Sequence, residues 1–172
     1  ELGKIMRPYQ IEAFKWLKTL NKYNLGGVLA DDMGLGKTIE TIALLDSVES
    51  SFPSIIISPK SLIYNWEKEL NKWPTKLTPI VISGNKVERK KLLKNNYKEN
   101  NVYIISYDTL RNDLDEFNEY TFNYAILDEA QAIKNMQALK TKSVKRITSL
   151  NKLVLTGTPI ENSVADLWSI FD

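Results

Sequence analysis

The chain has 172 residues, of which 43% are hydrophobic and 26% charged, and its 23 basic against 21 acidic side chains leave a formal net charge of +2. This length and balance predict one globular domain with a substantial core, and a polyanionic partner would have to be met by local patches. Because the sequence has no Cys and no His, thiolate nucleophiles, Cys/His zinc sites and every catalytic triad with an imidazole base are excluded.

Short apolar runs recur along the chain, at residues 27–30, 54–57, 79–82, 102–105, 124–127 and 153–155. Several are rich in Val and Ile without polar alternation, which is typical of strands buried on both faces of a parallel sheet. Helical spacing between the runs is shown by Leu62, Ile63, Trp66, Leu70 and Trp73, and by Met136, Leu139, Ile147 and Leu150. This alternation predicts an α/β fold with an open, mostly parallel sheet of about six or seven strands and helices on both faces. Ligands of such sheets bind at the carboxyl ends of the strands.

The first apolar run leads into a glycine-rich turn, Asp31-Asp32-Met33-Gly34-Leu35-Gly36-Lys37-Thr38, and a helical pattern follows at once. A strand, a curled backbone and a helix N-terminus are what polyphosphate binding requires, because backbone amides and the helix dipole attract the anion. Lys37 would reach the β and γ phosphates, and the Thr38 hydroxyl would bind Mg²⁺. The general pattern has Gly where this chain has Asp31. The alternative is a glycine-containing helix start that binds no ligand.

The run at residues 124–127 ends in two carboxylates, Asp128 and Glu129. At the tip of a strand, Asp128 would hold Mg²⁺ through its water shell, and Glu129 would orient or deprotonate the attacking water. The alternative is an acidic helix start, in which the carboxylates only favour the helix dipole. Because a phosphate loop and this pair occur together with strand patterns between them, we predict an ATP and Mg²⁺ site with Lys37, Asp128 and Glu129 as catalytic residues.

With these residues in place, the chain resembles the first RecA-like lobe of the superfamily-two helicase-related ATPases, specifically the SWI/SNF-type DNA translocases and chromatin remodellers. The resemblance covers nearly all of the chain and consists of six motifs in the family's order. They are Arg7-Pro8-Tyr9-Gln10, residues 31–38, Ser58-Pro59-Lys60-Ser61-Leu62 with Asn65-Trp66, Ser106-Tyr107, Asp128-Glu129-Ala130-Gln131, and Thr156-Gly157-Thr158-Pro159-Ile160-Glu161-Asn162. The fold that the resemblance implies is a RecA-like P-loop NTPase lobe.

The resemblance also implies roles for single residues. ATP would be bound by Arg7, Gln10, Met33, Gly34, Leu35, Gly36, Lys37 and Thr38, with Gln10 on the adenine, and Mg²⁺ by Thr38 and Asp128. The strand that ends in Thr156 would lie between the strands that lead to Lys37 and Asp128. Hydrolysis would be coupled to DNA through Gln131, Thr156, Gly157 and Thr158, where Gln131 replaces a His that is frequent in relatives.

Contact with DNA has less support from the residues themselves than contact with ATP. By resemblance, the backbone of double-stranded DNA would be contacted by Lys60, Ser61, Ser106 and Tyr107, with little sequence preference because phosphate contacts do not read bases. Other basic residues are interpreted as solvated surface, namely Lys68 and Lys72 on one helix face with Asn65, and the segment with Lys86, Arg89, Lys90, Lys91, Lys94 and Lys98. Trp66 and Trp73 are interpreted as core residues rather than as platforms for bases.

In the family, an arginine finger from a second RecA-like lobe completes the charge on the transferring phosphoryl group. The four arginines of this chain are Arg7, Arg89, Arg111 and Arg146, and none lies in a pattern that places it on its own γ phosphate. We therefore expect residues 1–172 to form one ATP-binding lobe, with the second lobe outside this chain, and the isolated lobe to be nearly inactive.

The whole protein is expected to be a DNA-stimulated ATPase that translocates on double-stranded DNA and remodels protein–DNA complexes, with a DNA-bound protein as a further partner. The alternatives are a strand-separating DNA or RNA helicase and a non-catalytic, nucleotide-dependent binding module. No apolar run reaches the roughly 20 residues of a membrane span, so the expected setting is intracellular, without a membrane partner.

Overall fold

The computed structural model describes residues 2–30, 36–131 and 138–157, and the structural statements below refer to these residues. The strands are β1 (Gly27–Ala30), β2 (Ser54–Ser58), β3 (Thr78–Val81), β4 (Asn101–Ser106), β5 (Thr121–Leu127) and β6 (Thr148–Thr156). The α-helices are α1 (Pro8–Lys22), α2 (Lys37–Ser47), α3 (Ile63–Lys72), α4 (Lys86–Asn95), α5 (Tyr107–Asn112), α6 (Leu114–Phe117) and α8 (Ala138–Lys145). Two short 3₁₀ helices, η1 (Leu2–Lys4) and η2 (Lys60–Leu62), precede α1 and α3.

The described strands form one six-stranded sheet in the order β1-β6-β5-β2-β4-β3, and every neighbouring pair is parallel. This confirms the predicted parallel α/β fold, and β6 lies between β1 and β5, as the family resemblance implies. All six apolar runs fall on strands to within one residue, except that β5 and β6 begin earlier than predicted, at Thr121 and Thr148. The first halves of these two strands pair with each other through residues that include Thr148 and Ser149. Because these two residues are polar, a search for apolar runs does not find the start of β6.

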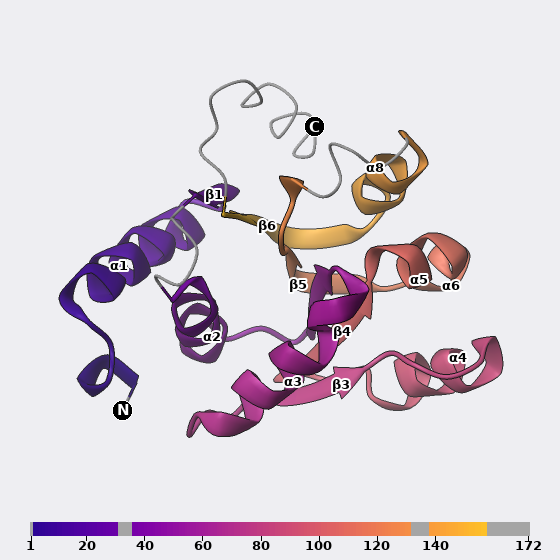
Figure 1. The fold of residues 1–172 in the computed structure, drawn as a ribbon, viewed down its shortest axis with the longest axis horizontal. Coiled ribbons are helices and arrows are strands. Elements are labelled where there is room, and N and C mark those ends of the chain that lie inside the picture. The colour runs from indigo at the N-terminus through magenta and orange to yellow at the C-terminus, as the bar shows by residue number, and fades with distance from the viewer. Residues whose placement is uncertain (1, 31–35, 132–137, 158–172) are drawn as a thin grey trace.

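Helices cover both faces of the sheet (Figure 1), and an apolar layer lies on each face. Buried residues of α1, α2 and α3 pack with Ile56 and Ile104 on one face, whereas those of α4, α5, α6 and α8 pack with Ile55, Ile57 and Ile105 on the other. Successive strand residues point to opposite faces, so the central strands are buried on both sides. All five residues of β2 are buried for this reason.

The second predicted helix is only partly correct. Of its residues, Leu139 lies in α8, which ends at Lys145, whereas Ile147 follows the helix and Leu150 lies in β6 with 54% of its surface exposed. Met136 lies outside the described residues. None of the described helices is long and apolar enough to cross a membrane.

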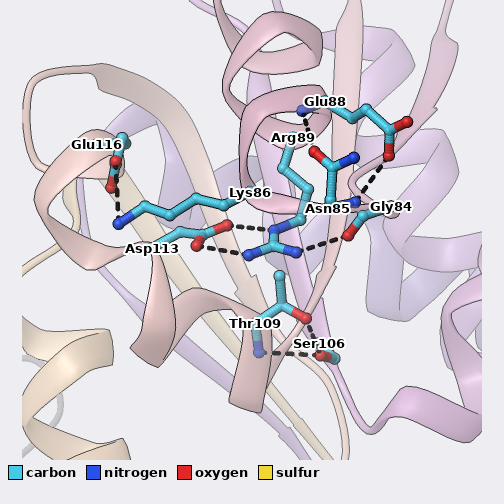
Figure 2. Close-up of polar contacts among 9 residues, drawn as sticks. All are labelled: Gly84, Asn85, Lys86, Glu88, Arg89, Ser106, Thr109, Asp113 and Glu116. Carbon is cyan, nitrogen blue, oxygen red and sulfur yellow. Dashed lines mark hydrogen bonds and ion pairs between the residues drawn. The ribbon is translucent and has the colours of Figure 1, made fainter.

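A polar cluster fastens α4 to the α5–α6 corner (Figure 2). The Arg89 guanidinium donates through Nε and Nη2 to the buried Asp113 carboxylate, at 2.5 and 2.8 Å, and through Nη1 to the Gly84 carbonyl at 2.6 Å. The hydrogen bond to Asp113 raises the pKa of Arg89 above its ordinary value. Lys86 forms a second, more exposed ion pair with Glu116 at 3.5 Å. In the basic segment, the lysines are exposed as predicted, but Arg89 is a structural residue rather than solvated surface.

Candidate nucleotide site

A cleft of about 500 Å³ opens at the carboxyl ends of the strands, between the start of α1, the start of α2, the end of β5 and α3. It is lined by Arg7, Gln10, Gly36, Lys37, Thr38, Asp128 and Glu129, which were all predicted to bind or hydrolyse ATP, and also by residues of α3. The structure therefore brings three motifs that are distant in sequence into one cleft. Met33, Gly34, Leu35 and Thr158 lie outside the described residues.

Lys37 and Thr38 form the first turn of α2, and Gly36 precedes the helix. Gly36 has a φ of 92°, which lies in the left-handed region that glycine adopts without strain. Because the first backbone N–H groups of a helix have no partner inside it, this turn can bind an anion. The α2 N-terminus thus presents amides, an ammonium and a hydroxyl to the same cleft.

Gln10 lies between the N-termini of α1 and α2. Its side-chain Oε1 accepts a hydrogen bond of 2.8 Å from the Arg7 backbone N–H. A Cβ atom added at Gly36 would lie 2.1 Å from Gln10 Nε2, so the amide packs directly against the end of the phosphate loop. Gln10 is buried and Arg7 is exposed at the rim. Contact of Gln10 with adenine, and of Arg7 with ATP, remains a prediction.

Four hydrogen bonds fix Asp128 at the tip of β5. Its Oδ2 accepts from the Trp66 indole N–H at 2.8 Å, and its Oδ1 accepts from the Glu129 backbone N–H at 2.9 Å. Its backbone carbonyl accepts from the Tyr107 hydroxyl at 2.7 Å, while its own N–H donates to the Ile57 carbonyl at 2.8 Å. Burial raises the pKa of Asp128, and the hydrogen bond from Trp66 opposes that rise. The carboxylate is therefore held in one orientation and is costly to ionise without a cation.

Glu129 is joined to the end of β6 by a short chain of side chains. The Gln131 amide donates to the Glu129 carboxylate, and the Thr156 hydroxyl donates to Gln131 Oε1 at 2.8 Å. The Ala130 N–H donates to the Leu155 carbonyl at 3.0 Å, which ties the two strand ends together. Two of the predicted coupling residues, Gln131 and Thr156, thus lie next to the predicted catalytic carboxylate. Gly157 follows β6 directly.

The residues predicted to contact DNA fall into two groups. Lys60 and Ser61 are exposed in η2, directly after β2. Ser106 and Tyr107 are buried, with 4% and 2% of their surface exposed. Ser106 Oγ caps α5 by accepting a hydrogen bond from the Thr109 N–H at 3.1 Å, and the Tyr107 hydroxyl donates to the Asp128 backbone carbonyl. The side chains of Ser106 and Tyr107 therefore have partners inside the fold, and contact of all four residues with DNA remains a prediction.

Helix α3 contributes cleft residues that the sequence analysis assigned to other tasks or did not single out. Trp66 is buried, as predicted for a core residue, but its indole N–H also reaches Asp128. Asn65 and Glu69 line the same cleft. Lys68 and Lys72 are exposed, which agrees with a solvated face, and the Lys72 ammonium lies 4.6 Å from the centroid of the Trp73 ring. The apolar spacing of α3 identified its buried side but not the partner of the indole.

The oxygen donors in the cleft fit Mg²⁺. The Thr38 hydroxyl and the Asp128 carboxylate are hard oxygen ligands, and Mg²⁺ commonly takes one or two such protein ligands together with waters and substrate phosphates. No group of three or more His, Cys, Asp or Glu that could hold a metal occurs in the part of the chain that the structure describes. Two oxygen ligands from the protein suit a cation that also binds substrate phosphates.

Comparison with known proteins gives the same picture. The family model of the SNF2-related domain matches residues 9–172. The chain is 42% identical to the TATA-binding protein-associated factor MOT1 of Saccharomyces cerevisiae over 97% of the chain and 10% of that protein. It is also 42% identical to an ATP-dependent helicase of Mycoplasma genitalium, over 97% of the chain and 16% of that protein. The chain thus spans between about a tenth and a sixth of the length of these relatives.

A solved structure, the Sulfolobus solfataricus SWI2/SNF2 ATPase core in complex with double-stranded DNA, superposes with a TM-score of 0.83 at 40% identity. The superposition covers 96% of this chain and 34% of the archaeal one. A RecA-like sheet, a cleft that joins a phosphate loop to an acidic strand end, and these matches agree with one another. The chain therefore belongs to the SNF2-related domain family of helicase-related ATPases and forms one of its ATP-binding lobes.

Proposed function

We propose that this chain is the ATP-binding lobe of a DNA-stimulated ATPase that translocates on double-stranded DNA and remodels protein–DNA complexes. The observation that carries the proposal is the convergence of Lys37 and Thr38 on the α2 N-terminus with Asp128 and Glu129 at the end of β5, all in one cleft. The archaeal relative was solved with double-stranded DNA, and the yeast relative is named for its association with a DNA-binding protein, which supports DNA and a DNA-bound protein as partners.

The proposed roles follow from the position of each group. Lys37 and the α2 amides bind the phosphates, and Thr38 and Asp128 hold Mg²⁺, which neutralises charge on the phosphoryl group being transferred. Glu129 orients the attacking water, because its carboxylate lies in the same cleft and is itself held by Gln131. The link from Gln131 to Thr156 then connects that carboxylate with the end of β6, which precedes the predicted coupling residues Gly157 and Thr158.

An arginine finger must come from elsewhere. Arg89 is engaged by Asp113, Arg111 pairs with Asp108 at 3.6 Å, and Arg7 lines the cleft beside Gln10 on the predicted adenine side. The fourth arginine, Arg146, lies before the start of β6, at the opposite end of that strand from the cleft. We therefore propose that a second RecA-like lobe of the same protein supplies the finger. Because a missing finger lowers turnover by about 10³ to 10⁵, the isolated lobe should bind ATP and hydrolyse it barely.

The test is the ATPase rate of the full-length protein with and without double-stranded DNA, in unchanged and Lys37→Ala forms. The proposal expects stimulation by DNA and loss of hydrolysis in the variant. Equal ATPase rates with and without DNA would overturn the proposal that the protein is a DNA translocase.

The Mycoplasma relative is named a helicase, so strand separation is the second candidate. Release of a labelled strand from a partial duplex would favour it. Normal hydrolysis by a Glu129→Gln variant would instead point to a site in which this carboxylate has no catalytic role.

A further inference from the structure

Two buried aromatic side chains from different helices hold the predicted Mg²⁺ ligand. The Trp66 indole, from α3, donates to Asp128 Oδ2 at 2.8 Å, and the Tyr107 hydroxyl, from α5, donates to the Asp128 backbone carbonyl at 2.7 Å. We propose that Trp66 and Tyr107 are positioning residues that set the Mg²⁺ affinity of the ATP site through Asp128. This inference rests on the proposed function.

The contacts go beyond what core packing requires. Trp66 and Tyr107 each have 2% of their surface exposed, and they belong to the apolar layers on opposite faces of the sheet. A phenylalanine would provide much of the same apolar contact at either position. Their polar atoms instead contact one residue at the end of β5. Trp66 donates to the Asp128 carboxylate from one face of the sheet, and Tyr107 donates to the Asp128 backbone carbonyl from the other.

Trp66 acts on the carboxylate itself. With Oδ2 bonded to the indole and Oδ1 bonded to the Glu129 N–H, neither oxygen of Asp128 can rotate away without losing a hydrogen bond inside the protein. Each oxygen still keeps a lone pair for the cation shell. Groups that orient a metal ligand in this way typically change metal affinity by about 10- to 100-fold when they are removed.

Tyr107 acts on the turn that follows. Glu129 has a φ of 49°, in the left-handed region that a non-glycine residue adopts at a cost. The hydrogen bond from Tyr107 fixes the carbonyl directly before Glu129, and so stabilises the strained turn that presents both carboxylates to the cleft.

The chain offers a matched control for each position. Tyr103 belongs to the same apolar layer as Tyr107, and its hydroxyl donates to the Leu93 carbonyl at 2.6 Å, away from the cleft. Tyr124 belongs to the layer of Trp66, and its hydroxyl accepts from the Asn21 amide at 2.9 Å. Tyr103→Phe and Tyr124→Phe therefore remove a partnered hydroxyl from the core without touching Asp128.

The experiment measures binding of a fluorescent ATP analogue to the full-length protein across a Mg²⁺ titration, and again with EDTA. For Trp66→Phe and Tyr107→Phe we expect the half-saturating Mg²⁺ concentration to rise about tenfold or more, while binding in EDTA stays within about twofold. The two control variants should keep the Mg²⁺ dependence of the unchanged protein even where their thermal stability falls. If Trp66→Phe does not fold, Tyr107→Phe, which loses a single oxygen atom, carries the test.

An unchanged Mg²⁺ dependence in both variants, or an equal shift in the controls, would overturn the inference and leave the proposed function standing. If the unchanged protein binds the analogue without any Mg²⁺ dependence and hydrolyses no ATP with DNA, the proposed function fails and the inference fails with it.

Discussion

Replacement of Gly36 by Ala tests how closely α1 approaches the end of the phosphate loop. A Cβ atom at this position would lie 2.1 Å from Nε2 and 3.2 Å from the side-chain amide carbon of Gln10. The left-handed φ of 92° is a second, independent penalty for any residue with a side chain. Gly36→Ala should therefore destabilise the chain even when no nucleotide is present.

The size of the effect follows from these two terms. The left-handed conformation costs an L-residue about 1 to 2 kcal/mol. Gln10 must also turn away, which breaks the hydrogen bond from the Arg7 N–H and costs about 0.5 to 1.5 kcal/mol. We expect a total loss of about 1.5 to 3.5 kcal/mol in the free energy of unfolding. In a Gln10→Ala background the clash is absent, so Gly36→Ala should cost only the backbone term.

Urea unfolding of the four chains, followed by far-ultraviolet circular dichroism without nucleotide, measures both the total and the coupling between the two positions. A Gly36→Ala chain within about 0.5 kcal/mol of the unchanged one would refute the left-handed geometry. A loss that is the same with and without Gln10 would show that the amide does not pack against Gly36.

Three further predictions concern other described residues. Asp113→Asn should lower the free energy of unfolding by about 1.5 to 3 kcal/mol, because it leaves the largely buried Arg89 guanidinium without its carboxylate. A double-mutant cycle with Arg89→Met that shows no coupling would contradict this. Because burial raises the folded-state pKa of Asp128, the folded chain binds more protons than the unfolded one above the ordinary Asp pKa, and ionisation lowers stability as pH rises through that window. The difference in free energy of unfolding between Asp128→Asn and the unchanged chain should therefore move in favour of the variant between about pH 4 and pH 7, and a constant difference across that range would be inconsistent with the raised pKa. Ser106→Ala removes the cap on the Thr109 N–H and should cost about 1 kcal/mol in the same assay, whereas an unchanged stability would argue against the cap.

Much of the fold could be predicted because parallel strands that are covered on both faces must be apolar throughout. Residues 54–57 and 102–105 could hardly be anything other than central strands, and both are buried as expected. The start of β6 could not be predicted in this way. Thr148 and Ser149 lie at the start of β6, where the strand pairs with β5 but not yet with β1, and both side chains are polar. The apolar but exposed Leu150 also fitted a helical spacing.

The candidate site shows a similar division. The phosphate loop and the acidic pair have local signatures, so sequence was sufficient to place Lys37 and Asp128 in one site. The contact between Trp66 and Asp128 joins residues 62 positions apart, and helical spacing identifies the buried side of α3 without showing what its indole meets. For Ser106, a local signal was available, since a serine directly before a helix is a common cap, and the family resemblance led to the different expectation of DNA contact.

The most direct test of the account is a crystal structure of the full-length protein with a non-hydrolysable ATP analogue and Mg²⁺. The account predicts the triphosphate on the α2 N-terminus, with Lys37 on the β and γ phosphates and the metal between Thr38 and Asp128. An analogue bound outside this cleft, or bound in it with Asp128 and Glu129 turned away from the phosphates, would contradict it.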